Sequence, residues 1–119
     1  MVELTIFFDF YPTQVGWMLS GPCGVVAEAT PGHYDNYFRR QQHVEAMEVQ
    51  AGHSYTFTIL DVNGQGLCCP SGRVSLALNR LDGTKEYLLR AADNFGSSLS
   101  TNFTVAGNAN TIDCAASNP

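Results

Sequence analysis

Apolar residues occupy alternate positions in several short stretches of this sequence. In the stretch from Ser54 to Leu60, for example, Tyr55, Phe57 and Ile59 alternate with threonines. A period of two is typical of a β-strand that buries one of its faces. The strand-like stretches are Glu3–Asp9, Gly16–Leu19, Val25–Glu28, Val44–Val49, Ser54–Leu60, Val74–Leu78, Glu86–Arg90 and Phe103–Val105.

Glycine and proline separate these stretches at intervals of about ten residues, which is typical of an all-β domain. Gly21-Pro22 and Asp82-Gly83 are two such breaks, and the second predicts a tight hairpin turn. No stretch shows a helical period. The sequence therefore predicts an all-β fold, namely an antiparallel two-sheet, jelly-roll-like β-sandwich with about eight strands and disulfides. We expect a single domain over residues 1–119, in which 107–119 form a polar tail.

Composition narrows the range of partners. Apolar residues make up 45% of the chain and charged residues 14%, which is typical of a packed globular unit. The net charge of −5 and a total of only six Lys and Arg argue against nucleic acid, whose binding draws on clustered basic residues. No apolar run is long enough for a membrane-spanning helix, so we expect no membrane insertion.

Four cysteines, an even number in a short chain, predict disulfides and an oxidising compartment. They are Cys23, Cys68, Cys69 and Cys114. Because Cys68 and Cys69 are adjacent and project in different directions, we favour bonds from each of them to the distant Cys23 and Cys114. A bond between the two neighbours is the alternative. The predicted location is secreted, extracellular or at the cell surface. Met1 is followed directly by a strand-like run with no leader, so if the protein is exported, we expect its signal peptide to have been removed or replaced.

The stretch from Asp61 to Gly72 contains candidate metal ligands. Asp61, Asn63 and Gln65 place side-chain oxygens at the first, third and fifth positions, and Gly66 follows at the sixth. This spacing resembles the opening of an EF-hand calcium loop. The alternative is a glycine-rich turn in which the Asp and Asn side chains cap backbone N–H groups. The residues leave both interpretations open.

Four segments in order resemble a β-sandwich module found in secreted proteases, polysaccharide-degrading enzymes and surface proteins of marine bacteria and microalgae. The most specific is the Asp-x-x-Gly-x-Gly-x-Cys-Cys loop that follows a Tyr-x-Phe-x-Ile strand. The segments are Asp9–Trp17, Gly52–Leu60, Asp61–Cys69, and Phe95–Ser98 with Thr101–Val105. The resemblance covers nearly the whole chain, and it implies a sandwich fold and an accessory role in a larger secreted protein.

The resemblance also bears on calcium. It adds Asp9 to Asp61, Asn63 and Gln65 as a predicted ligand. Gln65 stands where the family has aspartate, and Gln14 stands where it tends to have glutamate. Because the number of carboxylates tunes calcium affinity, we expect any calcium site here to be weakened.

Aromatic and basic residues gather in the polar stretch from Thr30 to Gln42. Flat rings with polar groups beside them suit the C–H faces and hydroxyls of a sugar. The predicted ligand-binding residues are His33, Tyr34, Tyr37, Phe38 and Arg39, with His43 beside them. The alternative is that some of these rings pack beneath the loop as a small core of its own. Trp17, which lies within an apolar run, is predicted to pack in the main core.

No nucleophile or metal-protease motif accompanies His33, His43 or His53, so we do not expect an enzyme. The leading hypothesis is a non-catalytic extracellular carbohydrate-binding module that binds a polysaccharide or glycan, with calcium as a structural ion. The main alternative is a protein-interaction or adhesion module that contacts another protein through the loop from Pro31 to Gln42. A small hydrolase is a third hypothesis.

Overall fold

The computed structural model describes residues 1–7, 15–32, 42–62, 72–80, 83–92 and 95–107. These residues form eight strands. The strands are β1 (Val2–Phe7), β2 (Val15–Gly21), β3 (Gly24–Ala29), β4 (Gln42–Met47), β5 (Ser54–Asp61), β6 (Arg73–Asn79), β7 (Lys85–Ala92) and β8 (Ser98–Thr104). The described residues include no helix, and so no helix that could cross a membrane.

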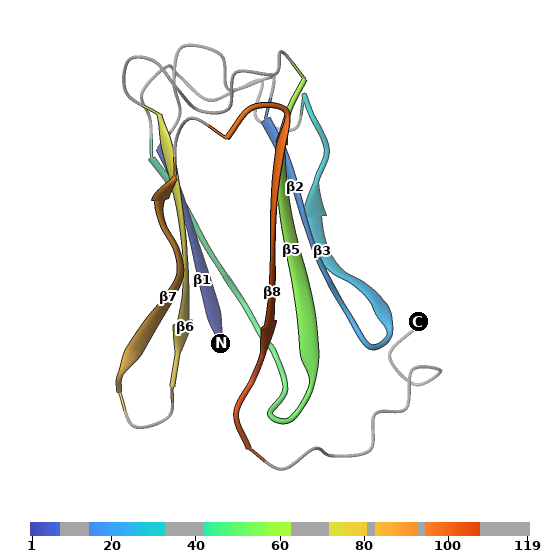
Figure 1. Cartoon of the computed structure of the whole chain (residues 1–119), viewed down its shortest axis with the longest axis vertical. Helices are drawn as coiled ribbons and strands as arrows, with labels where there is room; N and C mark the ends of the chain where they lie inside the picture. Colours follow the sequence, from blue (N-terminus) through green and yellow to red (C-terminus); the bar gives the residue numbers. More distant parts are fainter. Residues whose placement is uncertain (8–14, 33–41, 63–71, 81–82, 93–94, 108–119) are drawn as a thin grey trace.

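The strands form two antiparallel sheets of four, which confirms the predicted sandwich (Figure 1). The first sheet has the order β4-β1-β6-β7, and the second has the order β3-β2-β5-β8. Only β2 with β3, and β6 with β7, are neighbours both in sequence and in a sheet. Every other connection passes from one sheet to the other, as is typical of jelly-roll-like sandwiches.

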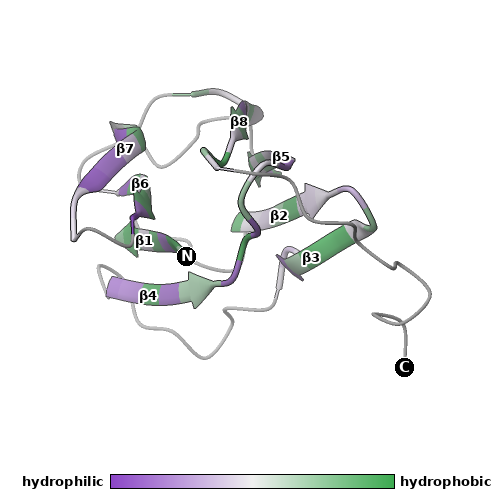
Figure 2. Cartoon of the chain, turned by 90° about the horizontal axis from the view of Figure 1, so that it is seen from below, coloured by the Kyte–Doolittle hydropathy of each residue, from purple (hydrophilic) through white to green (hydrophobic). Residues whose placement is uncertain are grey.

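The core lies between the two sheets and follows the period of two in the sequence. In β1, Val2, Leu4 and Ile6 are fully buried, whereas the residues between them are half-buried on the outer face. The predicted inward face of β5 is confirmed as well. The largest fully buried side chains are Phe57, Leu4, Ile6, Leu19, Ile59 and Leu76. Figure 2 looks along the sandwich from one end and shows the two layers on either side of this core.

Trp17 is a core residue, as predicted. Its side chain is 3% exposed, and its ring stacks on that of Phe57 with the ring centroids 6.1 Å apart. Burial of this size removes a large apolar area from water and makes the ring unavailable as a sugar platform. Trp17 therefore stabilises the contact between the sheets.

Strand β8 begins at Ser98, five residues before the predicted start at Phe103. The sequence pattern did not predict its first half, because the stretch Ser98–Asn102 is polar on its outer face. The outward residues of β8 bond instead to those of β5. Ser54 and Thr104 share a 2.8 Å hydrogen bond between their hydroxyl oxygens, and Thr56 donates to Asn102 at 2.7 Å. These cross-strand pairs hold an edge strand that lacks a clear hydrophobic alternation.

Tyr55 anchors the connection between β4 and β5. The buried hydroxyl of Tyr55 accepts a 2.9 Å hydrogen bond from the backbone N–H of Gln50. The tyrosine ring stacks on Phe103, with centroids 5.7 Å apart. On the strand beside it, β2 ends at Gly21, where a methyl group would lie 2.5 Å from Cε1 of Tyr55. The close approach of the two strands at this point therefore requires glycine.

Candidate functional site

Four connections between the sheets leave and rejoin the strands at the same end of the sandwich (Figure 1). They link β1 to β2, β3 to β4, β5 to β6, and β7 to β8. The strand residues that flank them are paired with one another: Phe7 with Gln42 and Arg73, Val15 with Asp61, Leu60 with Ser98, and Val74 with Ala92. We call this end of the molecule, defined by these flanking residues, the loop end.

Most predicted site residues belong to these connections and lie outside the described residues. This applies to the ligand-binding candidates His33, Tyr34, Tyr37, Phe38 and Arg39, to the metal candidates Asp9, Asn63 and Gln65, and to Cys68 and Cys69. Cys114, in the C-terminal segment after β8, also lies outside the described residues. The described residues on both sides of segments 8–14, 33–41 and 63–71 all lie at the loop end. The described residues at which these three segments begin and end therefore lie at one end of the sandwich, although the segments are far apart in sequence.

Asp61 is the predicted metal ligand that the structure describes. It is the last residue of β5, its backbone N–H donates to the carbonyl of Ser97 at 2.9 Å, and it is 4% exposed. The next residue, Val62, is 63% exposed. A carboxylate is stable in such a buried position only with hydrogen bonds or positive charge around it. Asp61 thus places a buried carboxylate at the point where the predicted calcium loop begins.

A metal site cannot be built from the described residues alone, because no three His, Cys, Asp or Glu side chains among them gather around one point. His43, at the start of β4, lies with Nε2 3.0 Å from Oε1 of Glu45. His43 thus has an acidic partner on its own strand. A metal-binding arrangement would therefore depend on Asp9, Asn63 and Gln65.

Cys23 is the one cysteine within the described residues. It follows β2 in the turn to β3, half-buried. The other three cysteines fall outside the described residues, so the pairing stays a prediction.

No protein-family model, curated protein or solved structure matches this chain. The resemblance to the secreted sandwich module therefore rests on the motifs of the sequence. Three of its four segments, those from Asp9, Asp61 and Phe95, include connections that attach at the loop end.

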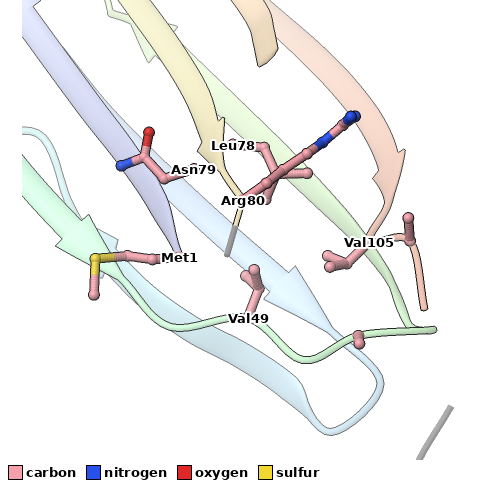
Figure 3. A pocket seen from close by; sticks show the side chains of 8 residues that line it. Met1, Val49, Leu78, Asn79, Arg80 and Val105 are labelled. Atoms are coloured by element: carbon pink, nitrogen blue, oxygen red, sulfur yellow. The ribbon is translucent and has the colours of Figure 1, made fainter. Parts of the chain in front are cut away.

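A cavity of about 410 Å³ opens at the opposite end of the sandwich (Figure 3). Its lining residues are Met1, Val49, Ala51, Leu78, Asn79, Arg80, Val105 and Ala106. The backbone N–H of Asn79 donates to the carbonyl of Met1 and that of Arg80 to Thr84, and the Arg80 side chain pairs with Glu86. A small-molecule site needs polar groups that converge on a ligand. Since the fold already uses these groups, we interpret the cavity as a gap between the ends of the two sheets.

One group of exposed residues was missed in the sequence. Tyr87, on β7, is 44% exposed, and the guanidinium of Arg90 lies 4.2 Å from the centroid of its ring. On β6, the guanidinium of Arg73 lies 4.9 Å from the ring centroid of Phe7. A signal was available, because four of the six basic residues fall between positions 73 and 90.

Proposed function

We propose that this chain is a non-catalytic extracellular module that binds carbohydrate at the loop end. The observation that carries the proposal is that four of the five connections between the sheets lie at the loop end of a rigid sandwich. Binding residues are concentrated on loops that a rigid scaffold positions. The segment that contains Tyr34, Tyr37 and Phe38 joins β3 to β4, and the described residues that flank it lie at this end. We propose that these rings stack on a sugar.

The proposed location is extracellular, with the module acting as an accessory to a larger secreted protein. The even number of cysteines in a short chain supports disulfides and an oxidising compartment, because disulfides are rare in the cytosol. We propose that Cys68 and Cys69 bond separately to Cys23 and Cys114. Such bonds would fasten the loop after Asp61 and the polar C-terminal segment to the sandwich.

A structural calcium ion is part of the same proposal. Asp61, Asn63, Gln65 and Asp9 would hold it, and the ion would supply a positive charge that organises oxygen ligands from two connections. The burial of Asp61 supports its assignment as the fixed ligand of this set. Two amide residues, Gln65 and Gln14, weaken the set by leaving it with fewer negative charges.

The first test is a binding survey of soluble glycans and insoluble polysaccharides, neutral and anionic. We expect the wild-type protein to bind at least one of them. Tyr34→Ala and Tyr37→Ala should each weaken that binding about tenfold or more, because aromatic anchors dominate such contacts. Isothermal titration calorimetry or affinity electrophoresis measures the change. Thr58→Ala, on the outer face of the second sheet, is the control and should bind as wild type does.

Two results would contradict the proposal. If the folded protein bound no glycan, carbohydrate binding would be wrong, and the protein-interaction hypothesis would replace it. If both tyrosine variants bound as tightly as wild type while folding normally, the site would not include the segment between β3 and β4.

The calcium proposal predicts a small thermal shift. Calcium in excess over its dissociation constant should raise the melting temperature by up to about 5 °C relative to a chelator, the shift that ~1 kcal/mol produces in a domain of this size. Differential scanning fluorimetry measures it. Asp61→Asn should abolish the shift, because it removes the fixed carboxylate.

Glu86→Gln is the matched control, since Glu86 is an exposed acid paired with Arg80 on the opposite side of the molecule. It should retain the calcium shift. An equal shift in wild type and Asp61→Asn would show that calcium binds elsewhere. Unfolding of the wild type in chelator would show that calcium has a larger role than we propose.

A further inference from the structure

Positive charge is concentrated on one hairpin of an otherwise acidic protein. The chain carries 11 Asp and Glu against six Lys and Arg. Every Lys and Arg among the described residues lies on β6, on β7 or in the turn between them. They are Arg73, Arg80, Lys85 and Arg90. Residues 73–90 thus hold four basic residues against two acidic ones, although the whole chain is acidic.

Two of these four side chains have a carboxylate partner. Arg80 pairs with Glu86, and Nζ of Lys85 lies 3.2 Å from Oε1 of Glu3. Within the described residues, Arg73 and Arg90 make no such ion pair. Each lies over an aromatic ring instead, Arg73 over Phe7 and Arg90 over Tyr87.

An arginine stacked on a ring is suited to binding an anion. The ring contacts the flat side of the guanidinium and limits its motion, while the N–H groups point outward along its edge. Those N–H groups form a planar fork that matches the two oxygens of a carboxylate or the oxygens of a sulfate. Arg73 and Arg90 are both exposed to solvent.

The two stacked arginines lie on the same surface. Phe7 is opposite Arg73 across β1 and β6, and Thr5 is opposite Ser75 one step further along. On these strands Leu4, Ile6, Val74 and Leu76 point into the core, so the residues between them face outward. On β7, Tyr87 is opposite Ala77, which lies between the inward Leu76 and Leu78, so Tyr87 and the Arg90 beside its ring also face outward. We call this surface, made of Phe7, Arg73, Tyr87 and Arg90 with the small side chains of Thr5 and Ser75, the basic face.

The second sheet offers no comparable surface. Its four strands contain no Lys or Arg. Its outward hydroxyl and amide groups bond to one another, as in the 2.8 Å contact between Thr58 Oγ1 and Ser100 Oγ. Among the described residues, cationic donors and exposed aromatic surface occur together on the basic face and nowhere else. It begins beside the loop end, because Phe7 and Arg73 are the strand residues that flank two of the connections.

We propose that the basic face binds an anionic polysaccharide, whose carboxylate or sulfate groups are held by Arg73 and Arg90. This inference rests on the proposed carbohydrate binding and adds the charge of the ligand. A long anionic chain can contact both arginines and extend to the loop end. Because the protein as a whole carries a net charge of −5, its overall field repels such a ligand, and the attraction must come from this local arrangement.

Two matched pairs of probes test the proposal: dextran sulfate against dextran, and polygalacturonate against its methyl ester. Within each pair the sugar backbone is the same and only the charge differs. We expect wild type to bind at least one anionic member about tenfold more tightly than its neutral counterpart. The difference should shrink near 1 M salt, where the Debye length is about 3 Å. The pair that shows the larger difference identifies sulfate or carboxylate as the group bound.

Arg90→Gln and Arg73→Gln should each weaken binding to the anionic member about tenfold, as expected for the loss of charge-assisted hydrogen bonds. Arg80→Gln removes the same charge from a side chain that is paired with Glu86, and should stay within about twofold of wild type. Arg90→Lys keeps the charge but not the fork, and should recover part of the loss. Circular dichroism and melting curves establish that each variant is folded.

The possible failures are distinguishable. Equal binding to charged and neutral probes, or equal losses in Arg80→Gln and Arg90→Gln, would overturn the basic face while leaving carbohydrate binding intact. Binding to no polysaccharide, charged or neutral, would overturn the proposed function and this inference with it.

Discussion

Phe57→Ala is expected to lower the free energy of unfolding by about 3–5 kcal/mol, as is typical of a large-to-small change in a packed core. Phe57 is fully buried at the centre of β5 and stacks on Trp17. Its strand lies between β2 and β8, so neighbours on both sides limit how far the cavity can collapse. Urea unfolding measures the effect as a fall in the denaturation midpoint at constant slope.

Thr58→Ala is the matched control for Phe57→Ala. Thr58 is the next residue of β5 and faces outward, where its hydroxyl contacts Ser100 at 2.8 Å. Losing this exposed contact should cost less than about 1 kcal/mol. Similar losses of stability in the two variants would contradict the structure, in which Phe57 faces the core and Thr58 faces outward.

Gly21→Ala is expected to destabilise the fold by about 2–3 kcal/mol, since the added methyl group would overlap the buried ring of Tyr55. That methyl would lie 2.5 Å from Cε1 and 2.6 Å from Cδ1 of Tyr55. The tyrosine cannot easily move, because its ring stacks on Phe103 and its hydroxyl accepts a hydrogen bond from Gln50. Thermal or urea unfolding of the single variant measures the loss.

A double-mutant cycle shows whether Tyr55 is the cause. Tyr55→Val removes both ring atoms that the methyl group would meet. In that background Gly21→Ala should cost close to nothing, which gives a coupling free energy of about 2 kcal/mol. If the losses of stability in the two single variants simply added up in the double variant, the cost of Gly21→Ala would not come from contact with Tyr55. If Gly21→Ala left the stability unchanged, it would contradict the close approach of β2 and β5 at this point.

The sheets could be predicted from sequence wherever burial on one face sets the pattern. Leu4 and Ile6 in β1, and Tyr55, Phe57 and Ile59 in β5, alternate because one side faces the core. Strand β8 was predicted only from Phe103 onward, since the pairing of its first half depends on β5, a strand more than forty residues earlier. The local hydrophobic pattern does not show that this stretch pairs with β5, because that pairing is set by the overall fold.

The candidate site shows the same limit. Asp61 was found from the spacing of oxygen ligands, and its position at the end of β5 does place it at the loop end. Arg73 and Arg90 were missed, because each is unremarkable in its own strand. Their significance comes from the rings of Phe7 and Tyr87, and Phe7 is a residue of a different strand that only the register of β1 and β6 brings beside Arg73.

Met1 lies at the end of the sandwich opposite the loop end, and its carbonyl is held there by the backbone N–H of Asn79. A support or carrier protein joined at Met1 would therefore orient every molecule in the same way, with the loop end pointing outward. Immobilisation through this residue would leave the segments that hold the proposed glycan contacts unobstructed. Surface-based binding measurements on this protein are accordingly best made with attachment at its N-terminus.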